Sequence, residues 1–484
     1  MKAGEKKMKM WCVSPLLSLF VLHLEANSGL KVRITQRGLN YGKEVGMKIL
    51  QQEIKEKGFP DRNGTQTFLF GTVDYRVSRI QITSISIHNT SVVLVPENRI
   101  VVAVRDASAR VSTHWTLNNW LLDYHGKAEI SILGISVTAT INMSQNNRGY
   151  LLMLVPDCRM SIGGIKVQLS GRGSWYYDMF FQYLEKTIQR KLQNRVCLSI
   201  KFRIQKMAAA LKKLQATSQI DSFAQIDYSL TKPPEVFRSY IELDFKASVY
   251  PIRNHTELLF MTVPFSLPDN NDNMMYFGIS EYFLKSLSLS YYTVGASKIH
   301  FSEEHSSSFN LTTEALSRII PEIAQHYTES HLVRTSVVVT AAPTVWLQNN
   351  SLTVKIPCFV EVSALLLNQT MQPIFALNIS AITNATVAIT EQRLIGSLQL
   401  KRLQLSLTYS NIGSFQVSFL KNLLACFLHN TVILPINDVL KRGFHLPNMA
   451  RIAFLGPAIK LNQVKLVFLC KGYILITTDV SYKY

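Results

Sequence analysis

Apolar and polar residues alternate through much of the first half of the chain, between residues 67 and 169. The alternation is clearest at residues 80–87 and 130–137, where isoleucine and valine are separated mostly by small polar residues. Successive side chains of a β-strand point to opposite faces, so a period of two predicts strands with one buried face. We therefore expect an antiparallel sheet in this region.

Two segments beside this sheet have helical spacing instead. Residues 38–57 gather apolar and small side chains on one side, and residues 175–214 repeat apolar side chains every three or four positions. Gly42 and Gly46 of the first helix cost up to about 1 kcal/mol each relative to alanine. They either let the helix pack closely on a sheet or leave room for an inserted lipid chain. The second helix is long and amphipathic, and the Lys and Arg on its other faces are either solvated or meet a membrane surface.

The second half of the chain repeats this order of elements. Pro233 and Pro234 follow an apparent strand and are the best candidates for a linker between the halves. The expected elements are strands from residue 241, a helix at 312–330, strands at 335–407, and a helical stretch at 414–441 broken by Pro435. Two halves that each place helices against an antiparallel sheet indicate an α+β protein built by duplication.

The N-terminus has the composition of a signal peptide. Four lysines precede an apolar run at residues 10–22, and the small Ala26 follows. The run is shorter than the roughly 20 residues that cross a bilayer, and we expect no later stretch to span one, so the chain should be secreted and extracellular. In a secreted chain, Asn-x-Ser/Thr sequons are candidate sites of N-glycosylation. Nine occur, at Asn63, Asn89, Asn142, Asn254, Asn310, Asn349, Asn368, Asn378 and Asn384.

Basic charge is concentrated in the first half. The whole chain has a formal net charge of +19. Residues 27–230 hold 27 Lys and Arg against 14 Asp and Glu, a balance of +13, whereas residues 231–484 hold 20 against 16, a balance of +4. Such a field attracts phosphate-bearing surfaces, whether lipid head groups, bacterial envelope or nucleic acid, without choosing among them.

The sequence has no motif of a catalytic or metal site. It contains no Gly-x-Ser-x-Gly elbow, no His-Glu-x-x-His and no phosphate-binding glycine loop, so we expect no enzymatic activity, no cofactor and no metal. Five cysteines follow the signal peptide, and this odd number leaves at least one thiol without an intramolecular partner. No two of them have the Cys-x-x-Cys spacing of a metal or redox site. Secretion and the lack of a recognised module argue against nucleic acid as a partner.

Several segments resemble, in order and spacing, the family of bactericidal permeability-increasing protein and lipopolysaccharide-binding protein. They run along essentially the whole chain after the signal peptide, and the first is most similar to the members grouped as family C. The segments are GLKVRITQRGLNYG at 29–42, residues 220–230 with Pro233 and Pro234, MYFGISEYF at 275–283, residues 393–398, residues 410–413 and KRGFHLP at 441–447.

The resemblance implies an elongated boomerang of two similar modules, each a twisted antiparallel β-barrel with long amphipathic helices, joined by a central antiparallel sheet. It implies a disulfide between Cys158 and Cys197, a monomer, and an apolar pocket in each module that holds a phospholipid. The implied divisions are a signal peptide at 1–26, modules at 27–228 and 251–455, a linker and central strand at 229–250, and returning strands at 456–484. The pocket candidates are Leu39, Gly42, Val45, Gly46, Ile49, Leu50, Phe180, Leu184 and Ile188.

One hairpin departs from the pattern of the endotoxin-binding members, which have Lys and Arg there. By alignment it is residues 112–125, and it contains neither residue type. Each basic residue near an anionic surface contributes about 1 kcal/mol, so strong binding of lipopolysaccharide through this tip is not expected. Two functions compete: recognition of bacterial lipopolysaccharide in innate defence, and carriage or transfer of host phospholipid. The apolar side chains of the hairpin either insert into a lipid interface or pack into the barrel: Trp115, Leu117, Trp120 and Leu121.

Overall fold

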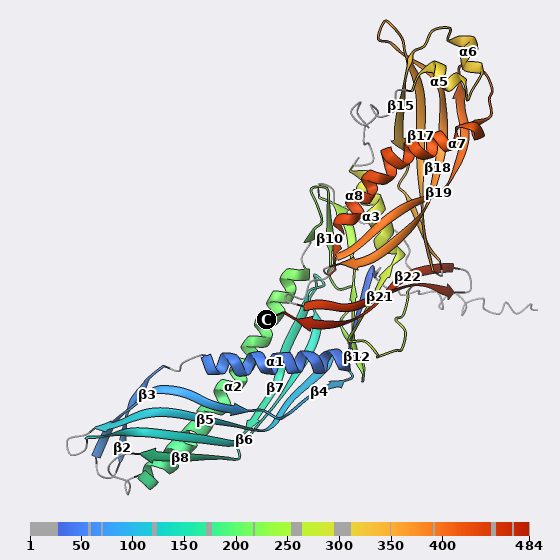
Figure 1. The fold of residues 1–484 in the computed structure, drawn as a ribbon. Coiled ribbons are helices and arrows are strands. Elements are labelled where there is room, and N and C mark those ends of the chain that lie inside the picture. Colours follow the sequence, from blue (N-terminus) through green and yellow to red (C-terminus); the bar gives the residue numbers. More distant parts are fainter. Residues whose placement is uncertain are drawn as a thin grey trace, which may run out of the picture.

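The molecule is elongated and bent, with one module at each end and a sheet between them (Figure 1). Its computed structural model describes residues 28–56, 60–68, 71–118, 123–170, 177–215, 218–252, 264–294, 311–348, 350–390, 393–446, 452–466 and 469–483. The two-module α+β boomerang expected from the resemblance is therefore confirmed.

The N-terminal module is built on a seven-stranded antiparallel sheet. The long strands β5 and β6 pair from Arg99 with Asn142 to Asn118 with Asp123 at the centre of this sheet. Of the two clearest alternating segments, residues 80–87 fall almost wholly in β3 and residues 130–137 fall in β6. The order is β2 (Arg62–Phe68), β3 (Gly71–Ser86), β5 (Arg99–Asn118), β6 (Asp123–Gln145) and β7 (Leu151–Ser161), with β4 (Asn89–Val95) on β5 and β8 (Gly164–Ser170) on β6.

Two helices accompany this sheet. The helix α1 (Gln36–Glu56) agrees with the prediction for residues 38–57, and α2 (Tyr177–Gln215) agrees with that for residues 175–214. Figure 1 shows α2 running along the length of the module. A disulfide between Cys158 of β7 and Cys197 of α2 fixes the helix to the sheet, as the resemblance implied.

A central six-stranded sheet joins the modules and draws strands from distant parts of the chain. Its order is β11 (Glu235–Val236), β12 (Tyr240–Phe245), β1 (Leu30–Thr35), β14 (Met275–Ser280), β22 (Leu469–Tyr482) and β21 (Ile452–Leu466). A smaller three-stranded sheet is formed by residues between the two modules: β9 (Ser218–Gln219), β10 (Ala224–Asp227) and β13 (Ser248–Pro251). One cluster of buried apolar side chains includes residues of both modules and of the central sheet, so the bend is a packed core rather than a free hinge.

The C-terminal module repeats the plan with a second antiparallel sheet. Its order is β15 (Leu332–Val339), β17 (Ser351–Leu365), β18 (Met371–Thr390), β19 (Arg393–Ser410) and β20 (Phe444–His445), with β16 (Thr344–Gln348) on β17. Both module sheets are open paths of strands over the described ranges, and the closed barrels that we expected are not formed there. The helix α3 (Glu281–Thr293) begins directly where β14 ends.

Two of the predicted helices differ in detail. The helix predicted at residues 312–330 is two short helices, α5 (Thr313–Ser317) and α6 (Glu322–His326), with Pro321 directly before the second. The helical stretch predicted at 414–441 contains η3 (Val417–Leu420), α7 (Lys421–Leu428), a π-helical turn (His429–Ile433) and α8 (Leu434–Arg442). Pro435 does not break it, because proline is tolerated in the first turn of α8, where backbone N–H groups lack a helical partner anyway.

The helical run Val417–Arg442 is long and apolar enough, by length and composition alone, to cross a membrane. This corrects our expectation that no stretch after the signal peptide would be. In the fold, its apolar side chains join the buried cluster under the C-terminal sheet, among them Leu424, Leu428 and Val432. The run is therefore used here to cover a sheet.

Candidate functional site

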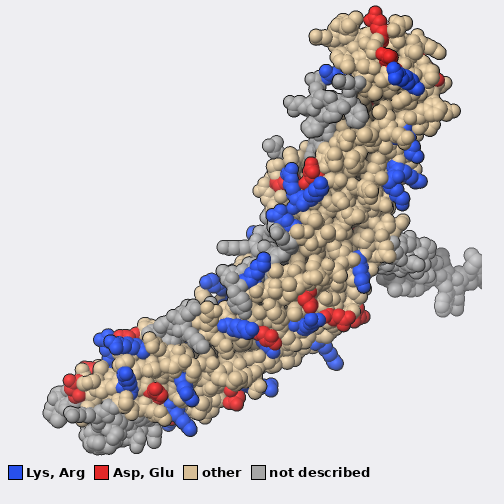
Figure 2. Space-filling model, in the orientation of Figure 1, with Lys and Arg blue, Asp and Glu red and all other residues tan. Residues whose placement is uncertain are grey.

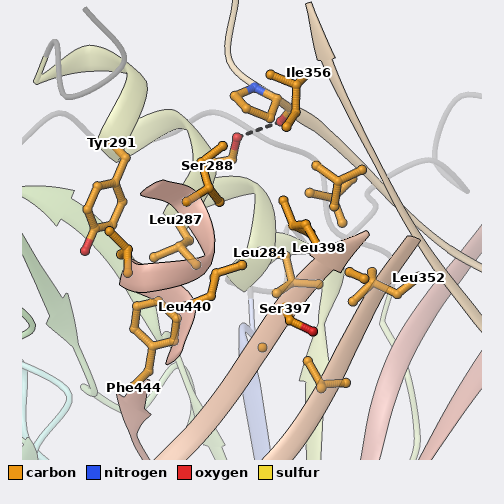
Figure 3. Close-up of a pocket in the computed structure, with 18 of the residues that line it drawn as sticks. Leu284, Leu287, Ser288, Tyr291, Leu352, Ile356, Ser397, Leu398, Leu440 and Phe444 are labelled. Carbon is orange, nitrogen blue, oxygen red and sulfur yellow. Dashed lines mark hydrogen bonds between the residues drawn. The ribbon is translucent and has the colours of Figure 1, made fainter. Parts of the chain in front are cut away.

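A cavity of about 250 Å³ lies in the C-terminal module, between its helices and its sheet. It is enclosed by α3 on one side, by the strands β17, β18 and β19, and by the π-helical turn with α8. Figure 3 shows Leu284 and Leu287 of α3 facing Leu352 of β17 and Leu440 of α8 across this space. Among the described residues, none that lines the cavity is charged, and the exposed wall that they form is almost entirely hydrocarbon.

Small residues on the sheet leave the space open. Ala385 of β18 and Gly396 and Ser397 of β19 line it where larger side chains would fill it. The alternation of β17 supplies the larger apolar wall, because Leu352 and Ile356 are two of its inward-facing positions. The cavity thus lies between α3 and the sheet, where small side chains of β18 and β19 stand beside larger apolar side chains of β17.

The polar side chains of α3 are bonded to neighbouring groups instead of to the cavity. The Ser288 hydroxyl donates to the carbonyl oxygen of Pro343 at 2.6 Å (Figure 3). The Tyr291 hydroxyl donates to Asp221 Oδ2 at 2.6 Å, in the loop between β9 and β10. Burial, together with this hydrogen bond, raises the pKa of Tyr291 above its ordinary value, so the phenol is neutral at physiological pH. Bonded in this way, these hydroxyls add little polarity to the wall.

The opposite wall is held by one asparagine. Asn437 of α8 is 7% exposed, and its amide contacts the backbone of Leu398 on β19 twice. The Leu398 N–H donates to Asn437 Oδ1 at 2.6 Å, and Asn437 Nδ2 donates to the Leu398 carbonyl at 3.0 Å. These backbone groups point away from β18, so the asparagine satisfies an edge of β19 that would otherwise be unpaired. It thereby fixes α8, which carries the lining residues Ile436 and Leu440, against the sheet.

None of the pocket candidates in the N-terminal module lines this cavity, and their role there remains a prediction. Leu39 packs at the edge of the large core cluster. Val45, Ile49 and Leu50 are half-buried, and Ile188 packs beside Ile132 and Ile165. Phe180 and Leu184 lie on α2 where the side chains are outside the described part of the structure.

The two helix glycines have open space beside them. A Cβ atom added at Gly42 or at Gly46 would have no other atom within 4 Å, and both residues are exposed. Close packing of α1 on a sheet, one of our two interpretations, therefore does not explain them. The other interpretation, room for an inserted lipid chain, stays a prediction.

Two family models match the chain, and together they cover most of it. One is the LBP / BPI / CETP family, N-terminal domain, at residues 38–213, and the other is the LBP / BPI / CETP family, C-terminal domain, at residues 218–479. The chain belongs to the LBP / BPI / CETP family. The linker prolines fall shortly after the second model begins, and the C-terminal cavity lies wholly inside it.

Relatives extend over nearly the full length of the chain. The human BPI fold-containing family C protein is 33% identical over 94% of this chain and 89% of its own length. Bactericidal permeability-increasing protein of Sebastes schlegelii is 29% identical over 98% of this chain and 100% of its own. A crystal structure of lipopolysaccharide binding protein has a TM-score of 0.59, at 23% identity, and covers 94% of this chain and 99% of that one. Similarity to family C, inferred from the first segment, is thus confirmed.

The apolar side chains of the hairpin were expected either to insert into a lipid interface or to pack into the module, and the structure distinguishes these alternatives for Trp115. Trp115 is 7% exposed, packs with Ala128, and donates from its indole nitrogen to the Lys127 carbonyl at 3.3 Å. Leu117 is half-buried beside it. Packing into the sheet therefore describes Trp115, and membrane insertion does not. Trp120 and Leu121 lie outside the described residues.

Five of the nine sequons are on exposed asparagines. Asn378 and Asn384 lie on the outer face of β18, Asn368 on the hairpin before it, and Asn63 and Asn89 in the N-terminal module. Asn142 is half-buried on β6, and Asn254, Asn310 and Asn349 lie outside the described ranges. Glycans at the two β18 sites would cover the face of the C-terminal sheet opposite to the cavity.

Among the described residues no cluster of His, Cys, Asp and Glu is arranged to hold a metal. Cys358 is buried and Cys426 is exposed, and both are free thiols. Burial raises the pKa of the Cys358 thiol to about 12. Figure 2 shows Lys and Arg outnumbering Asp and Glu on the visible face, in agreement with the positive net charge.

The resemblance implied a pocket in the C-terminal module, but sequence reasoning named none of its lining residues, because they are spread from Phe283 to Phe444 and none carries a distinctive chemistry. A usable signal was the pair of small residues Gly396 and Ser397 between the large apolar residues Ile395 and Leu398 of one strand.

Proposed function

We propose that this chain is a secreted lipid-binding protein that holds an acyl chain of a phospholipid in the cavity of its C-terminal module. The observation that carries the proposal is that the described lining residues include no charged side chain, and that the hydroxyls of Ser288 and Tyr291 are hydrogen-bonded to groups outside the cavity. Water gains few hydrogen bonds in such a space, whereas a hydrocarbon chain gains about 0.8 kcal/mol for each CH₂ that it buries. A volume of about 250 Å³ is near the lower end of ordinary ligand sites, so the cavity holds part of one chain.

The proposed activity is binding, carried out by a monomer without a cofactor or a chemical step. Lipids exchange between the pocket and a membrane because burial in either place removes the same apolar surface from water. The signal-peptide pattern at residues 1–26 and the exposed sequons on β18 support secretion.

Phospholipid is the first ligand that we propose, and lipopolysaccharide is the second. The names of two relatives, lipopolysaccharide-binding protein of Bos taurus and bactericidal permeability-increasing protein of Sebastes schlegelii, support a bacterial lipid and a role in innate defence. The hairpin without Lys or Arg supports the alternative of a carrier or transfer protein for host phospholipid. Both functions use the same cavity.

The test is native mass spectrometry of the purified protein, followed by identification of the lipids extracted from it. We expect phospholipid to be retained by the unaltered protein and lost from the variant Ala385→Phe, whose ring would occupy the cavity. Ala388→Phe is the matched control, because Ala388 is exposed on the same strand and faces the other side. Protein without any bound lipid, or equal retention by both variants, would contradict the proposal. Adding lipid A and phosphatidylcholine in competition then decides between the two ligands.

A further inference from the structure

The helix α2 is unusually basic over most of its length. From residue 186 to residue 215 it contains nine Lys and Arg and no Asp or Glu: Lys186, Arg190, Lys191, Arg195, Lys201, Arg203, Lys206, Lys212 and Lys213. A solvated helix of a core usually mixes both signs, because opposite charges three or four residues apart stabilise it and like charges destabilise it. The absence of acidic residues therefore needs another explanation.

Large apolar side chains lie on the outward face of the same helix. Leu198 is 64% exposed and Phe202 is 65% exposed, and they are one turn apart. Exposed cations surround them, because Arg195, Lys201 and Lys206 all fall within about a quarter turn of this pair on an ideal helix. Met207, another of the apolar residues that recur along α2, is also exposed, at 45%. The apolar residues of α2 therefore occupy two sides of the helix.

The outward face cannot turn inward to bury this pair. Cys197, next to Leu198, is bonded to Cys158 of β7, and Ile204 and Ala208 pack against the main core on the inner side. Burying the pair by rotating α2 would break the disulfide and expose the inner stripe. The exposed leucine and phenylalanine thus have no place in the core of this molecule.

We propose that this face of α2, defined by Arg195, Leu198, Lys201, Phe202 and Lys206, docks on an anionic lipid bilayer. Leu198 and Phe202 enter the interfacial region, and the three cations meet lipid phosphates and carboxylates. The face fits a bilayer better than an acidic protein, because two apolar side chains ringed by flexible cations on a convex helix are the arrangement of interfacial helices. No sequon lies in α2, so no N-glycan attached to the helix would hold it away from a membrane.

The docking face extends the proposed function by naming where the protein meets the membrane that supplies or receives its lipid. It is separate from the cavity, which is lined by residues of α3, α8 and the C-terminal strands. Each cation near an anionic surface strengthens binding roughly fivefold, so the three together contribute about a hundredfold. Burial of the leucine and phenylalanine adds about tenfold or more.

The experiment measures sedimentation of the full glycosylated protein with vesicles of phosphatidylcholine, with or without about 30 mol % phosphatidylserine. We expect binding only to the anionic vesicles, and weaker binding as salt rises from about 0.1 M to 0.5 M. The variant Arg195→Gln/Lys201→Gln/Lys206→Gln should bind about a hundredfold more weakly. Its matched control is Lys401→Gln/Arg402→Gln/Lys421→Gln, which removes the same charge from exposed positions of the C-terminal module and should bind as the unaltered protein does.

A second variant reports insertion directly. Tryptophan emission of Phe202→Trp, after subtraction of the unaltered protein, should shift to shorter wavelength on anionic vesicles. Phe419→Trp is the control, because Phe419 is 61% exposed but lies in the C-terminal module. Equal vesicle binding by the two triple variants, or no emission shift for Phe202→Trp alongside vesicle binding, would overturn the docking face. Far-ultraviolet circular dichroism and thermal melting check that the variants fold.

The outcomes for the docking face and for the proposed function are distinguishable. If the α2 variants lose vesicle binding but still contain phospholipid after purification, both proposals stand. If the unaltered protein binds anionic vesicles but contains no lipid, the docking face stands and the cavity proposal fails. If the protein contains lipid and does not bind anionic vesicles, the docking face fails alone.

Discussion

Asn437 attaches α8, which forms one wall of the cavity, to the sheet, and a single substitution there removes this attachment. Replacing Asn437 with alanine removes both hydrogen bonds to Leu398 and leaves a buried N–H and a buried carbonyl without partners. Each unsatisfied group costs about 1–3 kcal/mol, so we expect Asn437→Ala to destabilise the C-terminal module by about 2–5 kcal/mol. Because α8 carries one wall of the cavity, loss of this attachment should also speed the release of bound lipid.

Two measurements test this reasoning together. Calorimetry should show the unfolding transition of the C-terminal module lowered by roughly 5–15 °C. Transfer of a fluorescent phospholipid from the protein to excess vesicles should become faster. The adjacent Asp438→Ala is the control, since Asp438 is exposed. Unfolding within about 1 °C of the unaltered protein would refute the role of Asn437 as an attachment point. A lowered transition with unchanged lipid transfer would instead show that α8 does not confine the lipid.

Three further predictions concern covalent and titratable groups. Replacing both cysteines of the α2–β7 disulfide, which are 39 residues apart, with serine should cost about 4 kcal/mol in chemical denaturation of the N-terminal module, whereas Cys426→Ser should cost nothing measurable. Peptide mapping after alkylation at pH 8 should find Cys426 modified and Cys358 unmodified until the protein is unfolded, because the buried thiol has a pKa of about 12. The Tyr409 hydroxyl donates to the Glu361 carboxylate, which raises its pKa to about 12. A pKa raised in the folded state means that folding favours the neutral phenol, so the stability contributed by this hydrogen bond is complete below pH 10 and is lost between pH 10 and 12. Resistance to urea should therefore fall more over that interval in the unaltered protein than in Tyr409→Phe.

The sequence predicted the parts of the fold that local periodicity controls. Alternation located β3 and β6, and helical spacing located α1 and α2 to within two residues at each end. The π-helical turn before Pro435 was not predictable, because proline is compatible with a new helix start as well as with a break. Likewise, no local pattern showed that the sheets would remain open.

Sequence was less informative about which apolar side chains are buried. Trp115 pairs with Gly126 on the next strand, and a glycine there leaves room for the indole ring over the sheet. This cross-strand partner depends on the register of β5 and β6, which contains bulges that alternation does not reveal. On α2, the exposed Leu198 and Phe202 have the same chemistry as core residues. The disulfide at Cys197 and the packing of the inner side of the helix on the core determine which side faces outward.

The order of strands in the central sheet has a consequence for how the chain is made. The early strand β1 pairs with β12 and β14, but the other edge of β14 is completed only by β22, which starts at Leu469. At roughly 5–20 residues per second, synthesis from the end of β14 to the start of β22 takes on the order of 10–40 s. During this interval β14 presents an unpaired strand edge, and such edges recruit other chains. We expect newly made protein to depend on chaperones until β22 is added, and substitutions in β22 to reduce the yield of folded protein more than those in β15.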